Sequence, residues 1–189
     1  MDVDSTMELT DIELVAACLT GDREAFAGLV ARHQDAVFNL AYRMTGNHQD
    51  AADLAQEAFI RAFQKLHTYK PEYAFKNWVL GICANLTRNR WRSEARRHAL
   101  ENRHAVESAQ EHAAAPEQLD PRQAALEQAL QKLPEQARVP LVLKYMEGLS
   151  LEEISQTLRL GLSAVKMRIL RGREELLRLL RNTEKGQEI

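Results

Sequence analysis

Apolar residues recur with helical spacing along most of this 189-residue chain, whereas the alternation typical of half-buried β-strands is almost absent. In the first half, four series follow the i, i+3, i+4, i+7 pattern that places side chains on one face of an α-helix. These series cover residues 12–19, 26–44, 51–66 and 75–86. The spacing predicts four amphipathic helices around one shared core, and hence a compact all-α domain.

Residues with capping and helix-breaking properties mark the ends of these helices. Thr10 and Glu13 have the spacing of a capping box, in which each side chain bonds the other residue's backbone N–H at a helix start. Gly46 is expected to end the second helix, and the third is expected from Asp50. Pro71 interrupts the chain before the fourth helix.

The last third of the chain has the pattern of two short helices joined by a tight turn. Ser150 and Glu153 form a second capping box, and residues 159–162 cannot continue the apolar stripe that follows it. Ser163 then offers the N-cap of another helix. That helix carries a row of cations, Lys166, Arg168, Arg171 and Arg173. A basic second helix after a tight turn predicts a helix-turn-helix, whose second helix enters the major groove of DNA.

Between these halves, residues 98–121 have no sustained apolar face and contain three consecutive alanines and two prolines. The pattern predicts two small helical domains, 1–97 and 122–189, joined by a flexible linker over 98–121. An unstructured linker of this length spans roughly 27 Å, so the two domains could contact separate stretches of one polymer. Within the second domain, Pro140 lacks a backbone donor, and we expect a bend or a late helix start there.

The formal net charge of −2 averages segments of opposite charge. Residues 88–103 hold six Arg against two Glu, and residues 159–181 hold seven cations against two Glu. Between them, residues 104–121 hold four acids and no Lys or Arg. Two basic segments separated by an acidic one indicate two contact surfaces for one polyanion, although a solvated helix face would explain either segment alone.

The two cysteines, Cys18 and Cys83, lie far apart in helical stretches and form no CxxC pair. This pattern is typical of reduced cysteines in or near the core of a cytoplasmic protein. The acidic N-terminus has no signal-peptide pattern, and no apolar run approaches the length that spans a bilayer. We expect a soluble intracellular protein without membrane insertion.

One candidate docking surface lies on the predicted helix over residues 50–66. Ile60 lies on the face that should be hydrophilic, and its neighbours there are Asp53, Gln56 and Glu57. An apolar side chain within a polar rim suits the docking of another helix. A lone exposed isoleucine is also common and needs no function.

The fourth helix carries an amide and a guanidinium row at helical spacing: Asn85, Arg88 and Arg92. Guanidinium groups bind phosphates, and an Asn side chain can bond base edges. The preceding loop adds Tyr69 and Lys70, and aromatic rings beside cations can stack on unpaired bases. The combination favours single-stranded or melted DNA over intact duplex. Periodicity alone places Trp78 in the core.

Motifs for catalysis or metal binding are weak in this sequence. Glu101 and His104 have the ExxH spacing, but a di-metal carboxylate site needs two such pairs within a helical bundle. There is no HExxH motif and no glycine-rich phosphate loop. His33, on an apolar stripe, is expected to be a core or interface histidine. We therefore expect no catalytic residue, no metal and no cofactor.

Five segments taken together resemble bacterial sigma factors of the extracytoplasmic-function (ECF) type, within the sigma-70 family. They are DAADLAQEAF (50–59), FKNWVLGICAN (75–85), LPE (133–135), EGLSLEEI (147–154) and AVKMRILRGREEL (164–176). Their order and spacing match the family, and the resemblance extends from Asp11 to Leu180. It implies one domain that melts the promoter and a second that binds the −35 element.

The resemblance also implies roles for individual residues. The positions that dock on core RNA polymerase are Asp53, Gln56, Glu57 and Ile60. The positions that contact the opened −10 element are Tyr69, Lys70, Trp78 and Asn85, and the helical spacing adds Arg88 and Arg92 to them. The −35-reading positions are Lys166, Met167, Leu170 and Arg171, with Ser163 and Arg168 beside them. The implied partners are core RNA polymerase, promoter DNA and an anti-sigma factor. The nucleotide chemistry belongs to the polymerase, so the chain is expected not to be an enzyme.

Two positions depart from the family pattern. Arg159 stands where the family usually has glycine, and a non-glycine residue in the left-handed conformation costs about 1–2 kcal/mol, so a reshaped turn is expected. Met167 replaces a commonly polar residue, which favours contact with a thymine methyl group. Two alternatives stay open: a one-component helix-turn-helix regulator that acts without the polymerase, and a metal or interaction scaffold that binds no DNA.

Overall fold

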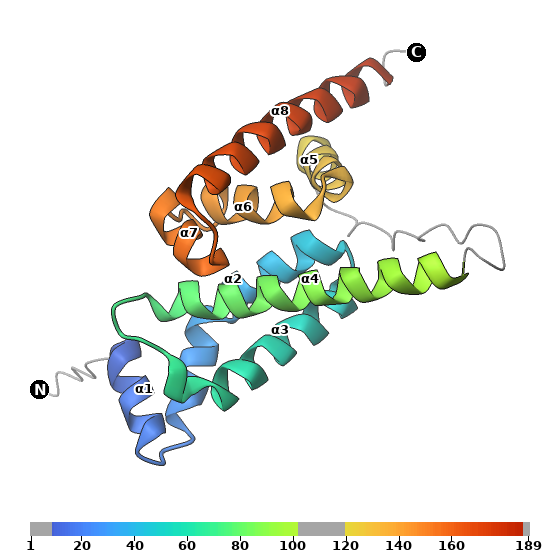
Figure 1. The fold of residues 1–189 in the computed structure, drawn as a ribbon. Coiled ribbons are helices and arrows are strands. Elements are labelled where there is room, and N and C mark those ends of the chain that lie inside the picture. The colour runs from blue at the N-terminus through green and yellow to red at the C-terminus, as the bar shows by residue number, and fades with distance from the viewer. Residues whose placement is uncertain (1–8, 102–119, 187–189) are drawn as a thin grey trace, which may run out of the picture.

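The computed structural model describes residues 9–101 and 120–186, and all regular secondary structure within them is helical (Figure 1). The first group of helices comprises α1 (Asp11–Leu19), α2 (Ala25–Thr45), α3 (His48–Gln64), the short 3-10 helix η1 (Leu66–Thr68) and α4 (Phe75–Glu101). The second comprises α5 (Pro121–Lys132), α6 (Glu135–Tyr145), α7 (Leu151–Leu158) and α8 (Leu162–Gly186). The predicted all-α fold is confirmed.

The first four α-helices form one bundle with a shared core, as the periodicity predicted. Helices α2, α3 and α4 pack against one another, and α1 packs against α2. Large apolar side chains from α2 and α4 are fully buried between these helices: Leu29, Val37, Leu40, Met44, Phe75, Val79 and Leu80. Alanines supply much of the buried face of α3, which allows this helix to approach α2 and α4 closely.

The predicted helix signals are largely confirmed. Both capping boxes form, at Thr10 with Glu13 and at Ser150 with Glu153. Gly46 ends α2 in the left-handed conformation, with φ 69°. The start of α3 was predicted two residues too late: the helix begins at His48, because the Asn47 side chain accepts a hydrogen bond from the Asp50 backbone N–H at 3.0 Å.

The second bundle is built on the contact between α6 and α8. Helices α5 and α7 also pack against α8, and the buried side chains include Leu133, Val142, Leu143, Ile154 and Val165. Gly172 allows the close approach of α8 to α6, since a Cβ atom there would lie 2.7 Å from Leu141 Cδ1. Helix α6 begins at Glu135 and contains Pro140, so the late helix start considered for this segment is wrong.

The predicted linker differs from the structure at its first residues. Helix α4 continues to Glu101, beyond residue 97 where the first domain was expected to end. Residues 102–119, which include His104 of the ExxH pair, lie outside the described residues. Helix α5 then begins at Pro121, capped by the Asp120 side chain.

Both cysteines are free thiols, with Cys83 buried and Cys18 half-buried. Over the described ranges, no helix has the length and apolarity needed to cross a bilayer.

Candidate functional site

The surface of α3 carries the predicted docking residues. Asp53, Gln56 and Ile60 are exposed, and Ile60 keeps 46% of its surface accessible. Glu57 is half-buried, and its carboxylate pairs with Arg61 one turn later on the same helix. The structure therefore brings the four residues together on one face, as the helical spacing predicted.

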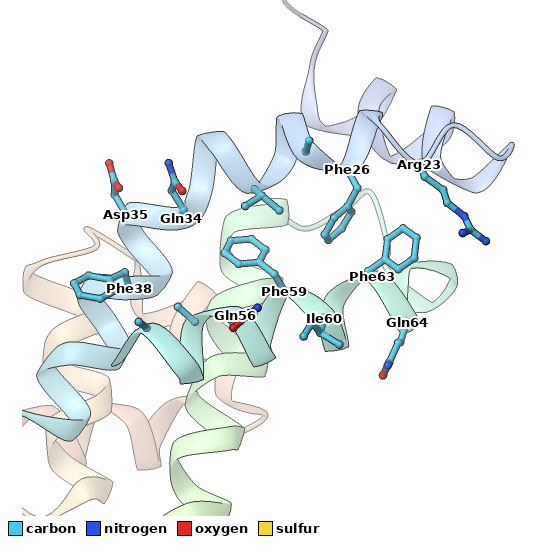
Figure 2. A pocket seen from close by; sticks show the side chains of 14 residues that line it. Arg23, Phe26, Gln34, Asp35, Phe38, Gln56, Phe59, Ile60, Phe63 and Gln64 are labelled. Atoms are coloured by element: carbon cyan, nitrogen blue, oxygen red, sulfur yellow. The ribbon is translucent and has the colours of Figure 1, made fainter. Parts of the chain in front are cut away.

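Beside this face, α2 and α3 enclose an apolar groove with a volume of about 770 Å³ (Figure 2). Gln56 and Ile60 line it, whereas Asp53 and Glu57 lie outside its lining. The rest of the lining is largely aromatic and aliphatic, with polar residues of α2 and of the turn before it at the edge: Phe26, Val30, Phe38, Phe59 and Phe63, then Arg23, Gln34 and Asp35. An apolar groove with polar edges is the surface that an amphipathic helix binds.

Phe63 is a residue of this groove that the sequence prediction misplaced. The periodicity of α3 assigned it to the core, yet 41% of its surface is exposed. Its ring lies edge-on against Phe26 of α2, with 5.0 Å between ring centroids (Figure 2). The sequence did contain a sign that Phe63 is exposed. It lies three residues from Ile60, and this spacing places both side chains on adjoining parts of one helix surface.

An aromatic cluster joins the loop after α3 to the start of α4. Tyr69 lies 5.4 Å from Trp78 and 5.6 Å from Phe75, measured between ring centroids. The Tyr69 hydroxyl donates a 2.6 Å hydrogen bond to the Tyr73 carbonyl. Burial raises the pKa of Tyr69, and the Asp11 and Glu72 carboxylates add to this effect. Trp78 is half-buried, packing on the core while part of its ring stays accessible.

The predicted row on α4 is only partly accessible. Asn85 and Arg92 are exposed, whereas Arg88 is half-buried, with its Nε 3.5 Å from a carboxylate oxygen of Glu135 on α6. Lys70, Trp78 and Asn85 come together at a groove of about 670 Å³, whose opposite wall belongs to α7 and the turn after it. Arg88 and Arg92 do not line this groove.

Helices α7 and α8 form the predicted helix-turn-helix. Val165 and Ile169 are buried, and the opposite surface of α8 carries the predicted reading residues. Ser163, Lys166, Met167, Leu170 and Arg171 are exposed, and Arg168 is half-buried. The predicted N-cap at Ser163 is wrong, because α8 already begins at Leu162. Ser163 therefore lies in the first helical turn, on the accessible surface.

The first helix of this motif is held by its capping box. The Ser150 N–H donates to the Glu153 carboxylate at 2.8 Å, and the Glu153 N–H donates to Ser150 Oγ at 3.1 Å. Hydrogen bonds from the Ser150 backbone and side chain lower the pKa of Glu153, and Asn77 and Lys76 act in the same direction.

The turn keeps the left-handed conformation despite its arginine, so the expectation of a reshaped turn was wrong. Arg159 has φ 53° and ψ 47°, and it is the only described non-glycine residue with positive φ. We predict that Arg159→Gly stabilises the protein by up to about 1 kcal/mol, because the relief of about 1–2 kcal/mol of strain exceeds the backbone entropy cost of glycine. Urea unfolding measures the difference. Gln156→Gly, at an exposed position inside α7, is the control and should destabilise by about 1 kcal/mol. Equal destabilisation by both changes would contradict the strain at Arg159.

No metal cluster is present in the parts of the chain that the structure describes: no group of three or more His, Cys, Asp or Glu side chains is placed to hold an ion. His33 contacts the Asp11 carboxylate at 2.8 Å and is half-buried, as expected for an interface histidine.

The candidate site is a set of three surfaces: an apolar groove, a partly covered polar face and a basic helix-turn-helix. Such surfaces define a DNA-binding protein that also docks on another protein.

Comparison with known proteins agrees with this class. Residues 29–97 match the family model "Sigma-70 region 2", and residues 118–176 match "Sigma-70, region 4". The ECF RNA polymerase sigma factor SigW of Bacillus subtilis is 34% identical, over 93% of this chain and 100% of that protein.

Solved structures agree in fold. The structure of CnrH in complex with the cytosolic domain of CnrY is 29% identical, with a TM-score of 0.66, covering 89% of this chain and 96% of that one. The sigma factor RpoE in complex with the anti-sigma factor NepR, from Bartonella quintana, shares the fold at 24% identity, with a TM-score of 0.67 over 82% of this chain and 96% of that one.

The chain belongs to the ECF sigma factors of the sigma-70 family. As a sigma factor, it binds RNA polymerase and directs transcription initiation at promoter DNA. This family is not a family of catalytic enzymes. The alternative of a regulator that acts without the polymerase is not favoured.

Proposed function

We propose that the groove between α2 and α3 is the surface on which this sigma factor docks to core RNA polymerase. The groove is apolar, and Ile60 and Phe63 are accessible at it. Asp53, Gln56 and Glu57 provide a polar border that can set the register of a bound helix. The partner element is an amphipathic helix of the polymerase, whose apolar face enters the groove.

The loop after α3 and the exposed side of α4 contact the −10 element as its strands separate. Tyr69 and Trp78 offer aromatic rings on which unpaired bases can stack. Lys70, Arg88 and Arg92 supply charge for the backbone, and Asn85 supplies an amide that can bond a base edge. The observation that supports this role is the convergence of Lys70, Trp78 and Asn85 on one groove.

The exposed surface of α8 reads the −35 element in the major groove. Lys166 and Arg171 are free to reach base edges or phosphates, and Arg168 and Ser163 lie beside them. Met167 and Leu170 are exposed apolar residues on the same surface, suited to contact with thymine methyl groups. The helix-turn-helix geometry of α7 and α8 supports this assignment.

Three further assignments accompany this function. The chain performs no catalysis of its own, because the nucleotide chemistry belongs to the polymerase. It acts in the cytoplasm, where the polymerase and the promoters are. It is controlled by an anti-sigma factor, a proposal supported by the similar fold of RpoE in its complex with the anti-sigma factor NepR. The residues up to Glu101 and those from Pro121 onward form the two domains of this proposal, and the segment between them connects the domains.

Transcription from a randomised promoter library tests the proposed function. The purified chain is added to core polymerase, and the start sites and upstream sequences of the products are determined. We expect two enriched sequence blocks upstream of the start sites, both absent when either protein is omitted. Products without any enriched upstream sequence would contradict the proposal.

A further inference from the structure

The two bundles contact each other along a continuous interface. Helix α7 packs on α4, and α5 and α6 pack on the end of α2 (Figure 1). Asn77 and Gly81 of α4 make direct contacts with α7, and Trp78 and Asn85 on the same side of α4 line the groove between the two helices. That side is the one to which the proposed function assigns the opened −10 element.

The first contact is a buried arginine. Arg138 of α6 is only 5% exposed, and its guanidinium donates to the Met44 carbonyl at the C-terminal end of α2 at 2.9 Å. The same guanidinium lies over the Trp91 ring of α4, with 4.8 Å between Cζ and the ring centroid. The last carbonyls of a helix have no intrahelical partner and carry partial negative charge, so they favour a cation. Arg138 thus links α6 to two helices of the other bundle.

The second contact is the close approach of α7 to α4 at Gly81. A Cβ atom at this position would lie 2.7 Å from the backbone carbonyl oxygen of Thr157, closer than such atoms approach in folded proteins. Next to it, the Asn77 amide donates a 2.9 Å hydrogen bond to the Glu153 carboxylate, and Asn77 is buried. Only glycine permits this spacing between the helices.

The third contact pairs cations of α4 with acids of the second bundle. Lys76 Nζ lies 3.2 Å from a carboxylate oxygen of Glu147, and Arg88 Nε lies 3.5 Å from one of Glu135. Each of these carboxylates pairs with a cation of α4 that could otherwise bind a DNA phosphate. The recognition surface of α8 has no such cover, because Lys166, Met167 and Arg171 remain exposed.

We infer that the free sigma factor is closed by this interface, which partly covers the −10 face of α4 and leaves the −35 face of α8 accessible. The assignment of this face to the −10 element rests on the proposed function. The closure itself does not depend on that function. Separation of the bundles is then required before an unpaired strand can bind along α4. Duplex containing a −35 element can bind α8 while the chain is closed.

The distance between two spin labels tests the closure without DNA or polymerase. The labels are placed at Ala31→Cys on α2 and Glu174→Cys on α8, both exposed, in a Cys18→Ser background. Cys83 can stay, since burial raises the pKa of its thiol to about 12. We expect one narrow distance distribution for the unmodified interface. Gly81→Leu should shift and broaden it, while α4 itself gains a better helix former.

Gly161→Leu is the matched control for the distance experiment, because a Cβ atom at Gly161 meets no other atom within 4 Å. The control should keep the narrow distribution. A broad distribution without any substitution, or a narrow one in Gly81→Leu, would overturn the closure.

Binding of fluorescein-labelled single-stranded oligothymidine tests what the interface covers. The double variant Glu135→Gln, Glu147→Gln releases Arg88 and Lys76 and should bind at least roughly fivefold more tightly than the unmodified chain, the effect expected of freed phosphate contacts. The control is Glu152→Gln, Glu174→Gln, which removes two exposed acids of the same bundle outside the interface. Equal affinities of the two double variants would overturn the inference that these carboxylates block the strand. If no variant bound the strand although the labels reported opening, the −10 assignment would fail and the closure would stand.

Discussion

Ile60→Asp is expected to weaken the affinity of the chain for core RNA polymerase by about 30-fold or more in Kd, equivalent to about 2 kcal/mol. Ile60 lies at the edge of the apolar groove with 46% of its surface exposed in the free chain. When a helix fills the groove, this surface becomes buried. When the groove is filled, a carboxylate in its place would be desolvated among apolar side chains.

Fluorescence anisotropy with labelled chain and purified core enzyme measures this affinity. Ile12→Asp is the matched control, because Ile12 is 52% exposed on α1 and does not line the groove. The same charge at that position should leave Kd within about twofold. Binding of −35 duplex by Ile60→Asp should be unchanged. Equal losses of polymerase affinity in the two variants would show that the groove is not the docking surface.

Arg171→Ala is expected to weaken binding to duplex DNA with the −35 element by about 1–3 kcal/mol, the value of one good contact between a side chain and a base. Arg171 is exposed on the outer surface of α8, about two and a half turns beyond the start of the helix. If Arg171 contacts a base, its loss should also make the chain less able to distinguish the correct base pair from other base pairs at one position of the −35 element. Affinity for core polymerase should not change.

Arg181→Ala controls for the loss of one positive charge on the same helix. Arg181 is exposed and lies about 15 Å farther along α8, at 1.5 Å per residue. Titrations at one fixed salt concentration compare the two variants, because the affinity of any cationic surface for DNA depends on salt. A sequence-independent loss of similar size in both variants would contradict a base contact by Arg171.

Local structure was predictable because its signals lie close together in the sequence. The capping boxes at Thr10 and Ser150 each consist of residues three positions apart, and both form as predicted. The helix-turn-helix and the face around Ile60 could be placed for the same reason, since helical periodicity alone groups their residues.

Features that depend on packing between helices were beyond this reasoning. Phe63 fits the apolar stripe of α3. Its ring is nevertheless not enclosed, because α2 and α3 leave a groove between them and the ring lies at its border. Arg138 stands in an apolar stretch of α6, and its burial makes sense only with the end of α2 beside it. The close contact of Gly81 with Thr157 depends on the placement of another bundle.

Permanganate reactivity of promoter thymines tests the central claim, that one bundle engages the polymerase and the opened strands while the other reads the duplex. A promoter recovered from the library is incubated with core enzyme and the chain. We predict reactive thymines at the −10 element only when both proteins are present, with the signal lost in Ile60→Asp and weakened in Arg171→Ala. Strand opening by the chain without core enzyme, or full opening with Ile60→Asp, would contradict this account.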